Sequence, residues 1–220
     1  MKLYLASANP GKLREFREAA RERGILLAPV PDISSLPPCV EDGLTFEANA
    51  RKKALHYSAR SDGLVFADDS GLCVDALNGA PGVHSARFAG PDADDDANNQ
   101  KLLTELRQVE ESNATKTGLT PSRSAFYVCV IVLAQEARVL GVVEGRVDGI
   151  ILDSPRGSGG FGYDPYFFYP PLGKTFAEIT TVEKFTVSHR GHAFRRLLDC
   201  LSKLPDPKID GSFPTGSKQV

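Results

Sequence analysis

Two adjacent aspartates, Asp68 and Asp69, follow the apolar residues 64–67 and precede Ser70 and Gly71. The apolar stretch predicts a buried strand that ends at the aspartates. Neighbouring carboxylates raise each other's pKa unless a cation compensates them, and Mg²⁺ prefers hard oxygen ligands and keeps substrate phosphates in its shell. Because adjacent strand residues point to opposite faces, the two need not have the same role. A turn rich in Asp, Ser and Gly is the alternative, and the buried strand before it favours a functional site.

A second polar segment, residues 7–12 (SANPGK), lies between a predicted strand and a predicted helix. The N-terminus of a helix presents free N–H groups and the positive end of the helix dipole to an anion. Lys12 adds a full positive charge, and Ser7 and Asn9 add hydrogen-bonding side chains. The segment lacks the first glycine and the final Ser or Thr of the Walker A motif. It predicts a phosphate-binding turn, with an ordinary capped helix start as the alternative.

The glycine-rich stretch RGSGGFGYDPYFF, residues 156–168, contains the spacing G-x-G-x-x-G of a dinucleotide fingerprint. That fingerprint requires a helix directly after the glycines, because the pyrophosphate of the dinucleotide binds at the helix N-terminus. Here prolines and aromatic residues follow, and no helix runs through them. We therefore expect a loop that leads into an aromatic strand, with Phe161 and Tyr163 placed beside a flat ligand or a phosphate.

The segment SHRGH predicts the start of the last helix, with Ser188 as its N-cap. His189 and Arg190 at a helix N-terminus suit an anion or the edge of a base, and ordinary surface polarity is the alternative. No third ligand stands at a spacing that would form a zinc site with the histidines. Glu41 and Lys53 offer a further carboxylate and a further cation, although each taken alone is typical of a surface charge.

Two other classes of site are excluded. Residues 94–105 match several ligand positions of a calcium loop, but Asn99 stands where that loop requires glycine. Leu102 and Leu103 continue a helical pattern, so the segment is interpreted as an acidic helix start. The sequence contains neither a G-x-S-x-G elbow nor a convincing Cys–His pair, and nucleophilic catalysis is unsupported.

The composition is that of a globular protein, with 220 residues of which 41% are hydrophobic and 25% charged. A net charge of -2 gives no general attraction to nucleic acid or to an anionic membrane. No apolar run approaches the roughly 20 residues of a membrane span, and the N-terminal residues are too polar for a signal peptide. The four cysteines lie far apart in the sequence and predict neither a disulfide framework nor a zinc knuckle. We therefore expect a cytoplasmic protein without nucleic-acid or membrane partners.

Apolar periodicity and turn residues predict a mixed α/β protein. The expected strands are residues 2–7, 25–30, 64–71, 125–135 and 138–151, of which the last two form a hairpin. The expected helices are residues 11–24, 45–63, 95–110 and 188–204. Residues 111–124 are expected to form a polar loop. Residues 1–204 are expected to form a single domain, followed by a flexible tail over residues 205–220.

Five stretches, taken together and in this order, resemble the family of inosine/xanthosine triphosphate pyrophosphatases. The stretches are SANPGKLREF, GLTFEANARKKA, FADDSGLCVDALNGAPGVHSARFAG, GSGGFGYDPYFF and EKFTVSHRGHA. They extend from about residue 5 to about residue 200 and are jointly very specific. The departures from the family pattern are mild: Ser7 stands where threonine is usual, the loop 111–124 is longer than typical, and the tail has no recognised counterpart.

The resemblance implies a fold and an activity. The fold would be a long central mixed β-sheet flanked by helices, in two lobes with the active-site cleft between them. The activity would be Mg²⁺-dependent hydrolysis of non-canonical purine nucleoside triphosphates, namely inosine, deoxyinosine and xanthosine triphosphate (ITP, dITP and XTP). The products would be the monophosphate and pyrophosphate, and the protein would be a homodimer.

The resemblance also implies roles for single residues. Glu41 and Asp69 would ligate the metal, Asp69 would also accept the proton of the attacking water with Asp68 in support, and Lys53 would neutralise phosphate charge. The phosphates would be held by Ser7, Ala8, Asn9, Pro10, Gly11 and Lys12. The nucleotide would be contacted by Ser70, Phe161, Gly162, Tyr163, Asp164, Lys184, His189 and Arg190.

The chemistry of the residues agrees with these roles. Stacking of a purine on Phe161 or Tyr163 would contribute about 1–3 kcal/mol. Donors such as His189 or Arg190 would select a 6-keto purine, since an adenine amino group facing them costs about 1–3 kcal/mol. Two alternatives stay open: a related pyrophosphatase for modified pyrimidine triphosphates, and a nucleotide-binding sensor that has lost catalysis.

Overall fold

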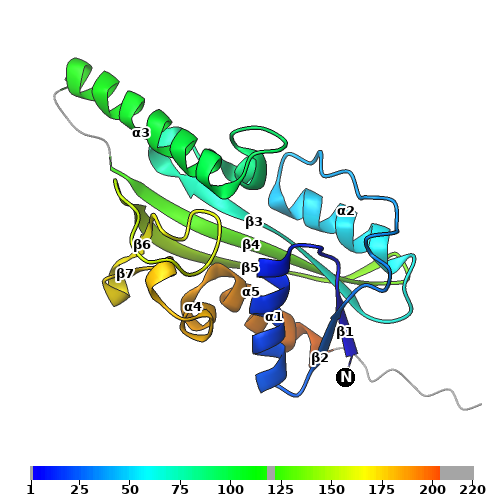
Figure 1. The fold of residues 1–220 in the computed structure, drawn as a ribbon. Coiled ribbons are helices and arrows are strands. Elements are labelled where there is room, and N and C mark those ends of the chain that lie inside the picture. Colours follow the sequence, from blue (N-terminus) through cyan, green and yellow to red (C-terminus); the bar gives the residue numbers. More distant parts are fainter. Residues whose placement is uncertain (1, 118–121, 204–220) are drawn as a thin grey trace, which may run out of the picture.

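One open seven-stranded sheet forms the centre of the fold (Figure 1). The computed structural model describes residues 2–117 and 122–203, so the expected tail over residues 205–220 lies outside the described residues. The strand order is β2-β1-β3-β4-β5-β6-β7. The strands are β1 (Lys2–Leu5), β2 (Leu26–Pro29), β3 (Val65–Val74), β4 (Ser124–Gln135), β5 (Arg138–Ile151), β6 (Phe167–Tyr169) and β7 (Lys174–Thr175).

The sheet is mixed, as expected. Strand β1 pairs in parallel with β2 and with β3, whereas the pairs from β3 to β7 are antiparallel. The predicted hairpin of β4 and β5 is confirmed, and its turn residues Glu136 and Ala137 both have positive φ angles, 49° and 56°. Two residues with positive φ match the twist of the flanking strands and fix the register of the hairpin.

The longer helices begin at residues whose side chains cap them. They are α1 (Pro10–Glu22), α2 (Phe46–Ser58), α3 (Asp95–Thr117), α4 (Thr181–Val187) and α5 (His189–Leu201). Asn9 caps α1 and Thr45 caps α2, each through a side-chain oxygen that accepts a backbone N–H. Ser188 caps α5, which confirms the prediction for that residue. None of the helices in the described ranges has the length and apolar character needed to cross a membrane.

Strand β3 is longer than its sequence predicts. It does not end at the aspartates but continues to Val74, so that Asp68 and Asp69 lie in its middle. The reason is tertiary, because β4 pairs with β3 along its whole length, from Val65 opposite Ala134 to Val74. Backbone hydrogen bonding to a neighbouring strand therefore outweighs the turn preference of Asp, Ser and Gly.

The prediction of a polar loop over residues 111–124 is wrong for its first half. Helix α3 continues to Thr117, and residues 118–121 lie outside the described part of the chain. The segment from Glu111 to Thr117 contains neither glycine nor proline, so nothing in it ends the helix that precedes it. Between residues 111 and 115 its polar side chains are mostly exposed, which explains why apolar periodicity gave no signal there.

The two faces of β3 pack against different elements, and Figure 1 shows α2 on one side of the sheet and α1, α4 and α5 on the other. Val65 and Ala67 contact the α2 side of the core. Phe66 lies on the opposite face in a cluster with α1 and α5, and Leu72 and Val74 lie in a further cluster with α3. Asp68 falls between these last two clusters, where it interrupts the apolar face.

The edge of β3 is open beside the aspartates. Strand β1 pairs with β3 at two positions, Tyr4 with Val65 and Leu5 with Phe66, and then ends. The chain leaves β1 through Ala6, whose N–H donates to the carbonyl of Phe66. Beyond this point the turn that leads into α1 takes the place of a strand, and a cleft forms beside the middle of β3.

Helix α5 approaches β5 so closely that Gly145 has no room for a side chain. A Cβ atom at this position would lie 2.9 Å from the Cβ of His192 and closer still to the backbone of His189 and Ala193. Gly145→Ala should therefore lower the free energy of unfolding by about 1–3 kcal/mol, the usual cost of overpacking. Denaturant unfolding measures this, with the exposed neighbour Glu144→Ala as control. Equal stability of the two variants would contradict the close packing.

Candidate active site

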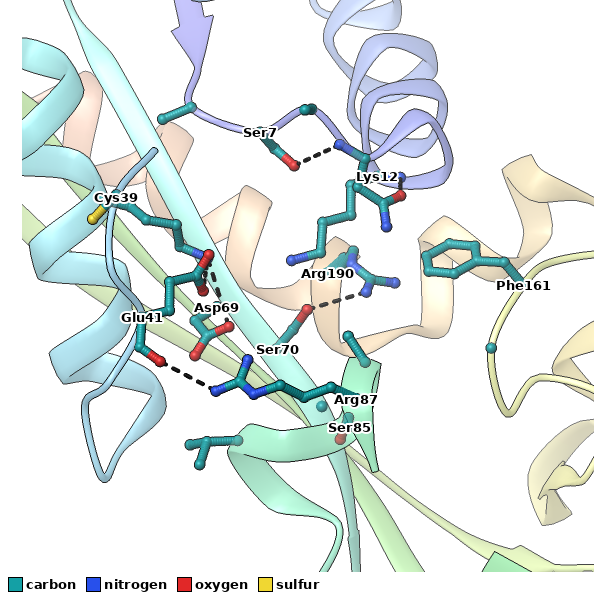
Figure 2. Close-up of a pocket in the computed structure, with 18 of the residues that line it drawn as sticks. Ser7, Lys12, Cys39, Glu41, Asp69, Ser70, Ser85, Arg87, Phe161 and Arg190 are labelled. Atoms are coloured by element: carbon teal, nitrogen blue, oxygen red, sulfur yellow. Dashed lines mark hydrogen bonds and ion pairs between the residues drawn. The ribbon is translucent and has the colours of Figure 1, made fainter. Parts of the chain in front are cut away.

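A cleft of about 720 Å³ opens at the edge of β3 where β1 ends. Its walls come from the turn between β1 and α1, the segment before α2, α2 itself, the 3₁₀ helix η2 (Gly82–Arg87) and the glycine-rich loop. Figure 2 shows the labelled side chains of Asp69, Ser70 and Lys12 near its centre, with Glu41 and Phe161 on opposite sides. A volume of this size is typical of sites for small organic ligands.

Asp68 is fully buried and faces cations from the side of α1. Its Oδ2 lies 2.8 Å from Lys12 Nζ and accepts a hydrogen bond from Ser70 Oγ at 3.1 Å. Burial alone would raise the pKa of Asp68, but Lys12, Lys53 and Arg190 outweigh burial and hold this pKa below its usual value. The carboxylate is therefore charged at neutral pH. Its second oxygen, Oδ1, has no hydrogen-bond partner among the described residues.

Asp69 faces the opposite side, toward α2. Its Oδ2 accepts a hydrogen bond from Asn49 Nδ2 at 3.1 Å, and its Oδ1 lies 3.6 Å from Lys53 Nζ. Burial raises the pKa of Asp69 above its usual value in spite of Lys53. The structure thus confirms that the adjacent aspartates have different surroundings, with one carboxylate held in its charged form and the other closer to accepting a proton.

Glu41 and Asp69 converge on one ammonium group. Lys53 Nζ lies 2.9 Å from Glu41 Oε2 and 3.6 Å from Asp69 Oδ1. No group of three or more His, Cys, Asp or Glu side chains is arranged for a metal within residues 2–117 and 122–203. Mg²⁺ commonly binds to one or two carboxylates together with substrate phosphates. Two converging carboxylates that line the cleft fit such a shared site.

The turn from residue 7 to residue 12 presents several polar groups to the cleft. Ser7 Oγ accepts the N–H of Asn9, and Asn9 Oδ1 accepts the N–H of Lys12. The expected phosphate-binding residues that line the cleft are Ser7, Ala8, Asn9 and Lys12. Pro10 and Gly11 begin α1 and do not line it. A Cβ at Gly11 would lie 2.8 Å from Phe161 Cδ1, so this glycine lets the helix start approach the aromatic ring.

A buried network of charges joins α1, α4, α5 and the glycine-rich loop. Lys184 Nζ lies 2.6 Å from Glu15 Oε1 and 2.6 Å from Asp164 Oδ2. Arg190 lies 3.1 Å from the other oxygen of Glu15 and donates to Ser70 Oγ at 3.0 Å. Burial would raise the pKa of Glu15, but Arg190 and Lys184 outweigh burial and lower it. The network connects α1 with Ser70 of β3, with the glycine-rich loop and with the consecutive helices α4 and α5.

Glu15 was not expected from the sequence to belong to the site. It lies three positions after Lys12, within the resembling stretch SANPGKLREF, and this helical spacing was the available signal. A glutamate on a helix is usually exposed, and its burial follows from the packing of α4 and α5 against α1.

Two residues of α3 hold the peptide groups of Gly162. Asp95 Oδ2 accepts the Gly162 N–H at 2.6 Å, and Asn99 Nδ2 donates to the Gly162 carbonyl at 3.0 Å. The neighbouring Phe161 ring has Lys184 Nζ and Arg190 Cζ at 4.9 Å each from its centre. From the sequence, Asp95 was expected only as an acid at a helix start. The structure gives it a second contact, which fixes the loop beside the cleft.

Tyr163 and His189 are both buried, in different surroundings. The hydroxyl of Tyr163 donates to the carbonyl of Ser85 at 2.8 Å, while Tyr163 also lines the cleft. The His189 ring stacks on Tyr127 at 4.6 Å between ring centres, and Tyr127 rather than His189 lines the cleft. Neither ring nitrogen of His189 has a hydrogen-bond partner in the described residues. Burial lowers the pKa of His189, and Arg190 lowers it further, so the ring is neutral.

Glu15→Gln should cost about 3 kcal/mol of unfolding free energy at pH 7, because it leaves buried Arg190 without its carboxylate partner and Lys184 with Asp164 alone. The pKa of Glu15 is lower in the folded chain than in the unfolded chain, where it is about 4.3. The difference in unfolding free energy between the wild type and the variant should therefore be fully present above about pH 4.3. This difference should shrink as the pH falls through the pKa of Glu15 in the folded chain. Denaturant unfolding at several pH values measures this. Glu18→Gln, on the same helix in an exposed pair with Arg21, is the control and should change little.

His189→Gln should make stability less dependent on pH. The pKa of His189 is lowered in the folded chain. As the pH falls below about 6.5, the histidine is therefore protonated in the unfolded chain but stays neutral in the folded chain. The free energy of unfolding of the wild type should then fall by up to about 1.4 kcal/mol per pH unit relative to that of the variant. Thermal or denaturant unfolding between pH 7.5 and 5 measures it, and parallel curves would show that His189 is not held neutral.

Three comparisons place the chain among known proteins. The sequence model of the Ham1 family matches residues 3–200. The chain is 48% identical to the "dITP/XTP pyrophosphatase" of Syntrophobacter fumaroxidans, covering 89% of this chain and 79% of that protein. It is 43% identical to the protein of the same name in Desulforamulus reducens, covering 93% and 97%. A solved HAM1 protein from Coxiella burnetii matches with a TM-score of 0.78 and 39% identity, over 93% of this chain and 100% of that one. The chain belongs to the Ham1 family.

Proposed function

We propose that the protein hydrolyses the non-canonical purine nucleoside triphosphates ITP, dITP and XTP to the monophosphate and pyrophosphate. The observation that carries the proposal is the buried pair Asp68 and Asp69 in the middle of β3, of which Asp69 lines the cleft, with Lys12 facing Asp68 and Lys53 facing Asp69. Phosphoryl-transfer sites need cations and a water-activating group around the phosphates and little covalent chemistry. The names of the relatives from S. fumaroxidans and D. reducens support the substrate class.

Asp69 would act on the attacking water. In the proposed step the water oxygen forms a bond to the α-phosphorus, and the bond from that phosphorus to the bridging oxygen breaks. The pyrophosphate leaves with the bridging oxygen, and Asp69 accepts one proton from the water. The raised pKa of Asp69 accords with proton acceptance, whereas Asp68 stays charged and holds Lys12 in place.

Glu41 and Asp69 would hold a Mg²⁺ ion together with the substrate phosphates. The chemistry that Mg²⁺ supplies at such a site is neutralisation of charge on the phosphate oxygens. Lys53, which lies between the two carboxylates, would then be free to turn one or more of its donors toward a phosphate. Ser7, Asn9 and Lys12 would hold phosphate oxygens from the turn before α1.

The base would lie on the side of Phe161. The Phe161 ring lies against Lys184 and Arg190, so its orientation is fixed before a purine stacks on it. Arg190 lines the cleft and would donate to a 6-keto oxygen, with His189 in support behind Tyr127. An adenine amino group facing these donors would cost about 1–3 kcal/mol, roughly a 5- to 150-fold preference.

The proposal includes the state of the protein in the cell. The family resemblance supports a homodimer and a single domain of two lobes over residues 1–204. A net charge of -2 supports the absence of a nucleic-acid partner. The four cysteines are all unpaired, which supports a reducing, cytoplasmic location. Light scattering on the purified chain tests the dimer.

Pyrophosphate release from ITP, XTP, ATP, GTP and a pyrimidine triphosphate, each with and without Mg²⁺, tests the function. We expect metal-dependent release from ITP and XTP at rates at least about fivefold above those for ATP and the pyrimidine. Preference for the pyrimidine would favour the related pyrophosphatase considered above. Tight binding of ITP without release of pyrophosphate would identify a sensor, and either result would overturn the proposal.

Asp69→Asn should lower kcat by about 10²–10⁴-fold, the usual loss when a general base is removed. The melting temperature should stay near that of the wild type, since Asn49 can still hydrogen bond to the amide oxygen. Asp148→Asn, in an exposed pair with Arg146 on β5, is the matched control for the charge. Wild-type turnover in Asp69→Asn would show that another group activates the water.

A further inference from the structure

We propose that Arg87 is a further positioning residue of this site, which binds the pyrophosphate part of the substrate and holds Glu41 in place. The inference rests on the proposed function, and Arg87 is not among the site residues expected from the sequence. If the inference holds, phosphate binding and the placement of the Glu41 carboxylate both depend on the guanidinium of Arg87.

Arg87 is the last residue of η2, and η2 is fixed to β3 directly after the catalytic aspartates. Ser85 Oγ accepts the N–H of Leu72 at 2.9 Å and lies close to the Gly82 carbonyl, to which it donates at 2.6 Å. A Cβ at Gly71 would overlap Ser85 Oγ, so glycine at this position lets η2 lie against the strand. The backbone that carries Arg87 is therefore held at a defined place relative to Asp69.

The side chain of Arg87 reaches across the cleft to the segment that carries Glu41. Its Nη2 donates to the Glu41 carbonyl at 3.1 Å, a contact between residues 46 positions apart (Figure 2). That segment, residues 37–43, has no regular secondary structure. From the other side it is held by α2, through hydrogen bonds between Asn49 and Gly43 and the ion pair of Lys53 with Glu41. The segment around Glu41 is thus held from one side by α2 and from the other side by Arg87 of η2.

Arg87 differs from the other basic side chains of the cleft in having no carboxylate partner. Lys12, Lys53 and Arg190 line the cleft, and each forms an ion pair with an aspartate or a glutamate. Arg87 also lines the cleft and is half-buried, but no ion pair joins it to any residue of the described ranges. One of its five N–H donors is used, by the Glu41 carbonyl.

An unpaired guanidinium in a polar cleft is suited to phosphate. Its planar array of donors matches two oxygens of one phosphate group, which a lysine cannot do in the same way. Figure 2 shows Arg87 directed toward Glu41 and away from Phe161. The guanidinium therefore faces the metal-binding side of the cleft, where the β- and γ-phosphates would lie, and not the side of the base.

One side chain would then link two events. When the guanidinium binds the pyrophosphate part, it is held between the phosphate and the Glu41 carbonyl, and the irregular segment around Glu41 is fixed with it. The carboxylate of Glu41 is then in place for the ion that the phosphates share. Loss of Arg87 should therefore weaken pyrophosphate binding and divalent-ion binding together, while leaving the base side of the cleft unchanged.

The experiment compares Arg87→Met and Arg87→Lys with the wild type. Met keeps the apolar stem, and Lys keeps the charge without the paired donors. Arg60→Met is the matched control, because exposed Arg60 also donates to one backbone carbonyl, that of His56, outside the cleft. Calorimetry measures binding of pyrophosphate with Mg²⁺, of Mn²⁺ alone, and of inosine monophosphate. Steady-state kinetics with ITP give kcat, KM and the Mg²⁺ concentration for half-maximal rate.

We expect Arg87→Met to weaken pyrophosphate binding about tenfold or more, the loss typical of a charge-assisted hydrogen bond. Mn²⁺ binding should weaken, the half-saturating Mg²⁺ concentration should rise, and Arg87→Lys should recover part of both. Binding of inosine monophosphate should stay within about twofold of the wild type, and Arg60→Met should behave as the wild type.

Two results would overturn the inference. If Arg87→Met binds pyrophosphate and Mn²⁺ as tightly as the wild type, the guanidinium contributes neither to phosphate binding nor to the placement of Glu41. Equal weakening of pyrophosphate and inosine monophosphate, with a lowered melting temperature, would show a general structural role. Failure of the proposed function is a separate result, since the wild type itself would then release no pyrophosphate from ITP.

Discussion

The burial of two adjacent carboxylates in the middle of the sheet is the constraint on which the rest of the structure depends. Taking one charged group out of water costs several kcal/mol unless other charges and hydrogen bonds compensate it. Asp68 and Asp69 point to opposite faces, so compensation has to come from both sides of the sheet. Lys12 supplies it from α1, and Asn49 and Lys53 supply it from α2.

This requirement explains why the helices meet at the edge of β3. The apolar clusters on the α1 face lie before and after Asp68, and the polar gap between them is filled by Ser70 and Arg190. Arg190 in turn requires Glu15, which also binds Lys184. The groups that compensate Asp68 are thus part of a network that fixes α4, α5 and the loop of Phe161. The ion pairs and hydrogen bonds that compensate the buried charges therefore also fix the positions of the segments that line the cleft.

Much of the fold could be predicted from local signals. Ser188 caps its helix, the hairpin of β4 and β5 turns at the expected residues, and the G-x-G-x-x-G stretch forms a loop before a short aromatic strand. The two errors in the bounds of elements have different causes, one long-range and one local. Strand β3 continues past Asp69 because β4 is there to pair with it, and α3 continues past residue 110 because no residue stops it. The residues missed at the site, Glu15, Asp95 and Arg87, are polar residues whose role depends on a distant partner.

The sequence by itself determined the residue types of the site, the order of its five stretches and the family to which they point, because these are properties of short segments. It also determined that Asp68 and Asp69 face opposite ways, since strand geometry requires this. Only the tertiary structure decided which cation faces which carboxylate, that Glu15 is buried, and that Arg87 reaches the segment of Glu41. The physical reason is that charge compensation acts through space, between residues as many as 175 positions apart in the chain.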